Sequence, residues 1–155
     1  MTEPAPSTPT APTSPIATAC PPSSGTFAGR VPQADPPMLR LDIPHTDYVL
    51  HLVLDGDLPT NPQPGDKLTG TLHAEALRVD TITAGGRYVE PGVGRPRRVQ
   101  GTIVGGNPSE NTLFVKAGAA TLACSLTDNR QSVADFHLHD MVSFDVKRGA
   151  SFRPI

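Results

Sequence analysis

The segment Met141-Val142-Ser143-Phe144-Asp145-Val146 alternates large apolar residues with polar or less bulky ones. Side chains of a β-strand point alternately to its two faces, so this period of two predicts a strand that buries Val142, Phe144 and Val146 on one face. The same alternation recurs between turn signals along most of the chain, while the 3.6-residue period of a helix is almost absent after residue 38. We therefore predict an all-β domain.

Outward from this segment, runs of apolar and β-branched residues bounded by proline, glycine and aspartate predict further strands. A longer run, residues 66–83, needs a bend, which Gly70 would allow. Residues 128–136 are the one stretch that fits a helical turn, with Asp128 as its N-cap. The strands are expected at 38–43, 48–54, 87–89, 97–104, 112–116 and 120–126.

Residues 97–148 form a recognisable order of elements. A strand carrying Val99 and Gly101 is followed by a hairpin, a third strand, the helical turn and then His139-Asp140 leading into the alternating strand. This layout resembles an OB-fold or a related small Greek-key barrel, in which the late strand begins with a Gly-Asp pair; His139 takes the place of that glycine. The resemblance implies a small antiparallel barrel whose missing fifth strand comes from residues before 84.

The first 37 residues differ in composition from the rest. They contain most of the 18 prolines together with many Ser, Thr and Ala residues, and few large apolar ones. Such a segment buries too little apolar surface to offset its ordering entropy. We predict a disordered tail over residues 1–37 and a single β-barrel domain over residues 38–155.

Targeting and redox signals are weak in this sequence. The tail lacks a basic region followed by a long apolar run, and no window has the 18 or more apolar residues of a membrane span. Two cysteines do not make a disulfide framework, and Cys124 shares a strand face with two leucines, which is typical of a core residue. The sequence favours a cytoplasmic protein without a membrane partner.

The most distinctive chemistry lies in an arginine-rich, glycine-punctuated segment, residues 85–101. Guanidinium groups donate paired hydrogen bonds to phosphate or carboxylate oxygens, and a neighbouring tyrosine can stack on a base. We expect a polyanion site at Arg87, Tyr88, Arg95, Arg97 and Arg98. The competing interpretation is a solvated loop whose arginines pair with nearby carboxylates.

Other functional classes have less support. The chain carries 13 Lys and Arg against 15 Asp and Glu, so no overall basic field attracts nucleic acid. His137 and His139 lie on one side of an extended segment, but a metal site needs three or four converging ligands. No nucleophile elbow and no glycine-rich loop before a helix is present, so we expect no enzyme, no catalytic residue, no metal and no cofactor.

These observations predict a non-enzymatic binding or adaptor module. Its expected ligand is single-stranded RNA or DNA, or another phosphate-bearing partner, held by the arginine-rich segment. The alternative is a protein-interaction or assembly subunit, in which edge strands of the barrel pair with another chain and the arginines bond its carboxylates. The sequence specifies neither the biological process nor the oligomeric state.

Overall fold

The computed structural model describes residues 19–58 and 61–155 and contains strands and two short 3₁₀ turns but no α-helix in those ranges. The all-β prediction is therefore confirmed. The strands are β1 (Ser23–Arg30), β2 (Met38–Asp42), β3 (Val49–Leu54), β4 (Lys67–Ala76), β5 (Asp80–Ile82), β6 (Tyr88–Glu90), β7 (Val93–Gly94), β8 (Arg98–Asn107), β9 (Thr112–Ala117), β10 (Ala120–Leu126), β11 (Met141–Asp145) and β12 (Ser151–Pro154), and the 3₁₀ turns are η1 (Pro108–Glu110) and η2 (Val133–Asp135).

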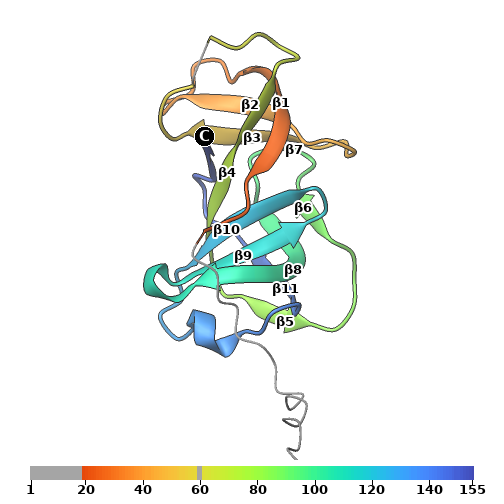
Figure 1. Ribbon diagram of the computed structural model, residues 1–155, viewed down its shortest axis with the longest axis vertical. Helices are drawn as coiled ribbons and strands as arrows, with labels where there is room; N and C mark the ends of the chain where they lie inside the picture. The colour runs from red at the N-terminus through yellow and green to blue at the C-terminus, as the bar shows by residue number, and fades with distance from the viewer. Residues whose placement is uncertain (1–18, 59–60) are drawn as a thin grey trace, which may run out of the picture.

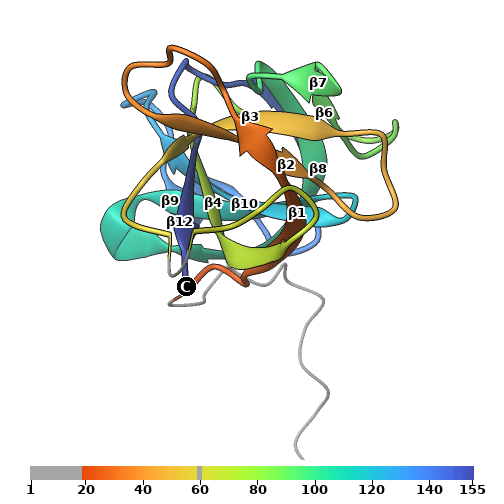
Figure 2. The ribbon, with the colours of Figure 1, turned by 90° about the horizontal axis from the view of Figure 1, so that it is seen from above.

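Five strands close into a barrel, which we call the first barrel. Around the ring they follow the order β1, β2, β3, β12 and β4, and β4 pairs again with β1. All neighbours are antiparallel except β3 and β12, which are parallel. Figure 2 looks onto this ring from above. The arrangement is an OB-like Greek-key barrel.

The strands of the predicted 97–148 unit form a second ring beside the first barrel. β9 follows β8, β10 follows β9, β10 pairs in parallel with β4, and β11 pairs with β8. The ring closes where Ala76 bridges Val146, flanked by backbone hydrogen bonds of 2.8 Å from Leu77 to Asp145 and from Lys147 to Glu75. The fifth strand of this unit thus comes from β4, before residue 84, as the sequence predicted.

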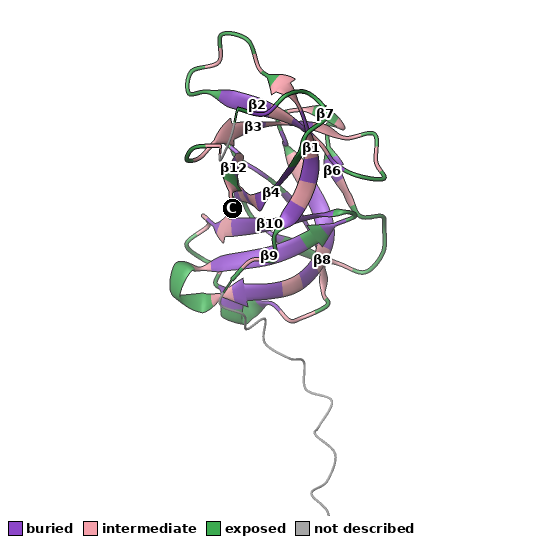
Figure 3. Ribbon diagram, turned by 45° about the horizontal axis from the view of Figure 1, so that its top comes forward, coloured by how far each residue is buried: buried purple, intermediate pink, exposed green. Residues whose placement is uncertain are grey.

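The two rings share the long strand β4 and one core. β4 pairs with β1 and β12 through residues 67–73 and with β10 through residues 72–76, so its two halves serve different rings (Figure 1). The exchange of strands is reciprocal. In chain order, the first half of β4 is the fourth strand of the first barrel, and its second half completes the second ring. Likewise β11, the fourth strand of the second ring, leads into β12, which completes the first barrel. Buried side chains from both rings belong to one hydrophobic cluster, and Figure 3 shows this burial running along the strands while the loops stay exposed.

Matching local geometry shows that the two rings have the same construction. Residues 25–29 in β1 and residues 101–105 in β8 both read Gly-Thr-apolar-X-Gly, and both strands shift register at the X position, as at a β-bulge. The residue just before the fourth strand of each ring in chain order makes the same backbone hydrogen bond. Before β4, the carbonyl of Asp66 accepts from the amide of Phe27 at 2.8 Å, and before β11, the carbonyl of Asp140 accepts from the amide of Ile103 at 2.9 Å. The two units therefore agree in hydrogen bonding as well as in strand order.

The Gly-Asp signal has a physical explanation in these turns. Gly65 has a φ of 102° and His139, at the corresponding position, has a φ of 74°. This left-handed conformation favours glycine and is costly for most other residues. Histidine at 139 therefore preserves the turn rather than interrupting the barrel pattern.

The predicted boundary of the tail is wrong for part of its length. β1 lies inside the expected tail 1–37, is paired on both sides and buries Phe27. Its other inward positions, Ser23 and Gly25, are small: a Cβ on Gly25 would lie 2.6 Å from Cγ of Leu41. Close packing at these two positions and burial of Phe27 together hold this segment in the barrel. Residues 1–18 of the expected tail lie outside the described residues.

Candidate polyanion-binding face

The outer face of β2 and β3 carries a polar cross-strand pair. Leu39 and Leu41 of β2 point into the core and are fully buried, so the residue between them points outward. That residue is Arg40, which lies opposite His51 of β3 in the antiparallel register. Both side chains are half-buried. The face that OB-like barrels use for ligands, strands two and three, is therefore occupied here by two nitrogen donors.

The guanidinium group of Arg40 has a buried donor without a partner. This donor is its Nε, and no described residue accepts a hydrogen bond from it. Its Nη2 lies only 2.8 Å from where a Cβ of residue 29 would stand, so Gly29, with a φ of 116°, makes room for the group. Buried donors in proteins are nearly always paired with protein atoms, water or ions. An anion or water would satisfy this donor only after a movement of the Arg40 side chain that opens the Nε to solvent.

The arginine-rich segment is attached to this same face. β7 pairs in parallel with β3, and the amide of Val49 donates to the carbonyl of Gly92 at 2.8 Å. The amide of Val89 donates to the hydroxyl of Tyr48 at 3.3 Å. These contacts hold the loop across the barrel strand and deliver Arg95, directly after β7, to the side of His51.

Electrostatics at His51 reflect this arrangement. Burial lowers the pKa of His51, and the positive charges of Arg40 and Arg95 lower it further. The imidazole is thus less basic than an ordinary histidine because it is partly buried and because two guanidinium groups lie near it. An anion bound between these groups would reverse the last two effects.

Arg95, Arg97 and Arg148 line one shallow hollow of about 180 Å³ together with Pro96 and Val146. Among residues 19–58 and 61–155, no carboxylate lies within ion-pair distance of any of the three guanidinium groups. The geometry thus adds Arg148, which sequence reasoning missed, to two of the predicted site residues.

A second hollow of about 190 Å³ adjoins the first. Arg95 and Arg148 line it with the outward side chains of Met38 and Val53, and Asp35 is the one carboxylate among its lining residues. The apolar floor lies on the same outer face of β2 and β3 as Arg40 and His51. Positive charge and an apolar surface therefore meet at one end of the first barrel.

The other three predicted residues have protein partners. Arg98 donates to Asp145 at 2.9 Å and to Ser143 at 2.7 Å, and its hydrogen bond with Asp145 is the main cause of its raised pKa. Tyr88 donates to Gln100 at 3.1 Å. Arg87 donates to the hydroxyl of Thr102 at 2.7 Å. The structure groups Arg95 and Arg97, while Arg87, Tyr88 and Arg98 tie β6 and β8 to their neighbours.

His137, the first residue of the predicted histidine pair, contacts the side chain of Asp140. His137 Nδ1 lies 3.5 Å from a carboxylate oxygen of Asp140, whose side chain also accepts the His137 amide at 3.2 Å. Within the described parts of the chain, no group of three or more His, Cys, Asp or Glu side chains is placed to hold a metal ion.

Both thiols are poor nucleophiles. Cys124 is fully buried in the core, which strongly raises its pKa, and partial burial raises the pKa of Cys20 to about 11. Because the thiolate is the reactive form, neither cysteine is activated at neutral pH.

Comparison with protein-family models, with curated proteins and with solved structures finds no match for this chain. In the described ranges, no helix has the length and apolar character needed to cross a membrane.

Proposed function

We propose that this protein is a non-enzymatic module that binds the phosphate backbone of single-stranded nucleic acid across the outer face of β2 and β3. The carrying observation is that Arg95, Arg97 and Arg148 line adjoining hollows at one end of this face, and that Arg95 and Arg40 both lie close enough to His51 to lower its pKa. None of the four arginines has a carboxylate partner among the described residues. Guanidinium groups that no protein acid neutralises favour phosphate oxygens.

Position in the fold supports the same function. OB-like barrels bind oligonucleotides over strands two and three and the loops beside them. Here those strands are β2 and β3, and the loops supply Arg95, Arg97 and Arg148. Val53 provides a partly exposed apolar side chain against which a base can pack next to the charged groups, and the buried Met38 lies beside it.

Charge sets the expected strength of binding. The chain has a net charge of −2, so attraction is local to the face rather than general. Four phosphate contacts on a single strand give a salt dependence of about −3 in the logarithm of the association constant per logarithm of salt concentration. Without an exposed aromatic platform on β2 or β3, binding should depend little on base sequence.

Fluorescence anisotropy of the full chain with labelled oligodeoxythymidine and oligouridine, at low and high salt, tests the proposal. The variant with Arg95, Arg97 and Arg148 changed to alanine should lose binding. A matched variant with Arg78, Arg130 and Arg153 changed to alanine has the same change in charge but removes arginines that form exposed ion pairs elsewhere. Equal loss in both variants, or no binding of either oligonucleotide at low salt, would refute the proposed site.

A further inference from the structure

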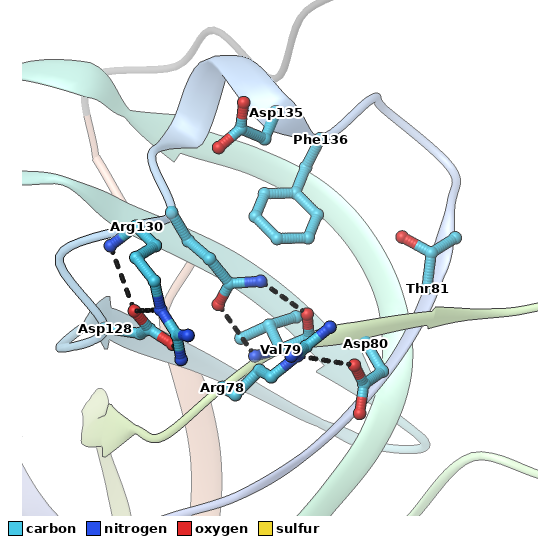
Figure 4. Close-up of a pocket in the computed structure, with 9 residues that line it drawn as sticks. Arg78, Val79, Asp80, Thr81, Asp128, Arg130, Asp135 and Phe136 are labelled. Carbon is cyan, nitrogen blue, oxygen red and sulfur yellow. Dashed lines mark hydrogen bonds and ion pairs between the residues drawn. The ribbon is translucent and has the colours of Figure 1, made fainter.

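β5 presents an open backbone edge beside a cavity at the far end of the second ring. The strand pairs on one side only, with β11, and is the last strand of the sheet order. Its residues Asp80 and Thr81 line a cavity of about 560 Å³. Figure 4 shows this hollow between the start of β5 and the segment that leads into η2.

Strand geometry fixes which groups point to the open edge. Backbone N–H and C=O groups of successive residues alternate between the two edges of a strand. In β11, Asp145 accepts from Leu77 on the β5 side, so Ser143 and Met141 also face β5. Their register partners Asp80 and Ile82 face back toward β11. The N–H and C=O of Thr81 therefore point away from the sheet.

The side chain of Gln131 already bonds to the backbone of Val79, the neighbouring outward-facing residue of this edge. Its side-chain amide donates to the carbonyl of Val79 at 2.7 Å and accepts from the amide of Val79 at 2.9 Å. These are the two hydrogen bonds that one residue of a neighbouring strand would make. The next outward position along the edge is Thr81, and no described residue bonds to its backbone.

Charges around the cavity indicate what kind of segment fits it. Asp80 is paired with Arg78 at 3.2 Å, and Asp128 is paired with Arg130 at 2.9 Å. Asp135 accepts the amide of Ser132 at 2.9 Å, and among the described residues it has no cationic partner. The cavity wall thus has one carboxylate left to receive a lysine or arginine.

From this geometry we infer that the β5 edge binds an extended, lysine- or arginine-containing peptide of a partner protein by strand addition at Thr81. The peptide residue opposite Thr81 donates to its carbonyl and accepts from its amide, extending the pattern that Gln131 begins at Val79. A basic side chain of the peptide pairs with Asp135. This site lies on β5 and η2 and is independent of the polyanion-binding face.

A peptide selection tests the inference. Full-length protein is used to select from a phage-displayed library of random twelve-residue peptides, and enriched peptides are titrated against Thr81→Pro and Thr81→Val variants. Proline is tolerated on an edge strand where the N–H faces outward, so the fold is retained, but it removes the donor that the peptide needs. We expect Thr81→Pro to weaken binding about tenfold or more and Thr81→Val to leave it within about twofold.

Two further readouts identify the contacts. The Thr81 amide resonance should shift and become protected from hydrogen exchange on titration, and Asp135→Asn should weaken the enriched basic peptides because it removes the charge but keeps the acceptor for Ser132. Failure to enrich any peptide, enrichment of peptides that bind Thr81→Pro equally well, or concentration-dependent self-association through Thr81 in place of peptide binding would overturn the inference.

Discussion

Removal of residues 1–37 should abolish cooperative folding, because it deletes β1. This strand pairs with β2 and β4 and closes the first barrel. Its Phe27 is only 4% exposed, and its Ser23 exchanges hydrogen bonds of 3.0 Å and 3.2 Å with the backbone of Thr121 in the second ring. Without β1, two strand edges and part of the core become exposed to water.

The expected magnitude comes from Phe27. Changing a buried phenylalanine to alanine costs about 3–5 kcal/mol, and the whole stability of a domain is about 5–15 kcal/mol. Phe27→Ala alone should therefore lower the thermal midpoint by about 6–20 °C in a chain of this size. Loss of the complete strand should leave little or no folded barrel.

Circular dichroism during urea and thermal unfolding measures this effect on chains beginning at residue 19 and at residue 38. The chain from residue 19 keeps every strand of the described residues and should match the full chain, whereas the chain from residue 38 should lose its cooperative transition. As a matched side-chain control, Val93→Ala alters a residue that is 62% exposed and should change stability by less than about 0.5 kcal/mol. A chain from residue 38 with an unchanged midpoint and slope would show that β1 does not close the barrel.

Three other perturbations follow from particular contacts. Gly101→Ala should destabilise the protein by about 1–3 kcal/mol in urea unfolding, because a Cβ there would collide with the carbonyl of Lys116; an unchanged midpoint would contradict that packing. His51 has a lowered pKa, and phosphate favours its protonated form, so oligonucleotide affinity should rise as the pH falls from 7.5 to 5.5, and His51→Gln should flatten this profile in anisotropy titrations. Hydrogen bonds from Arg130 lower the pKa of Asp128 from 3.8 to about 2, so any stability from this pair is complete above pH 3.8 and is lost as the pH falls through 2. The thermal midpoint of the Asp128→Asn variant should therefore converge with that of the parent protein at low pH. A difference between the two midpoints that persists at pH 1.5 would argue against the pair.

Period-two alternation predicted most of the strands but could not reveal β1. Alternation reports burial of large side chains, and β1 places Ser23 and Gly25 at positions that face the interior. Bulk at Gly25 would displace Leu41. A strand whose partners require small residues has the composition of a disordered segment, so the same steric requirement that holds it in the barrel hides it in the sequence.

The OB-like pattern was visible only in the second half for a related reason. His139-Asp140 and the alternating strand after it mark the fourth strand of the second ring, and the corresponding turn at Gly65-Asp66 lies in a loop rich in proline and glycine. The fifth strand of each ring is supplied by the other half of the chain. No local pattern specifies this exchange, because it depends on pairing between distant strands.

The residues of the proposed polyanion-binding face were only partly visible in the sequence, for similar reasons. Arg95 and Arg97 stand out in sequence because arginines cluster there, but Arg40, His51 and Arg148 lie on separate elements. The register of β2 with β3 brings Arg40 opposite His51, and the path of the chain before β12 brings Arg148 to Arg95 and Arg97. Sequence spacing carries no information about such a meeting.

The outer face of β2 and β3 differs from the corresponding face of β9 and β10 in the second ring. The register partners that correspond to Arg40 and His51 are Phe114 and Ala123, which are only 3% and 4% exposed. Phe114 stands opposite Gly105 as Arg40 stands opposite Gly29. The corresponding backbone positions therefore carry a polar pair in the first barrel and a buried apolar pair in the second ring, and we expect nucleic acid to bind only to the first.

Arginine side-chain spectra offer the most direct test of the binding face. Full-length protein labelled with ¹⁵N would be titrated with unlabelled oligodeoxythymidine at low salt while the Nε–Hε resonances are followed. We predict that Arg40, Arg95, Arg97 and Arg148 shift together and saturate at one concentration, and that the shifts reverse with added salt. Shifts confined to Arg87 and Arg98, or spread evenly over all arginines, would contradict the assignment of the polyanion-binding face to β2 and β3.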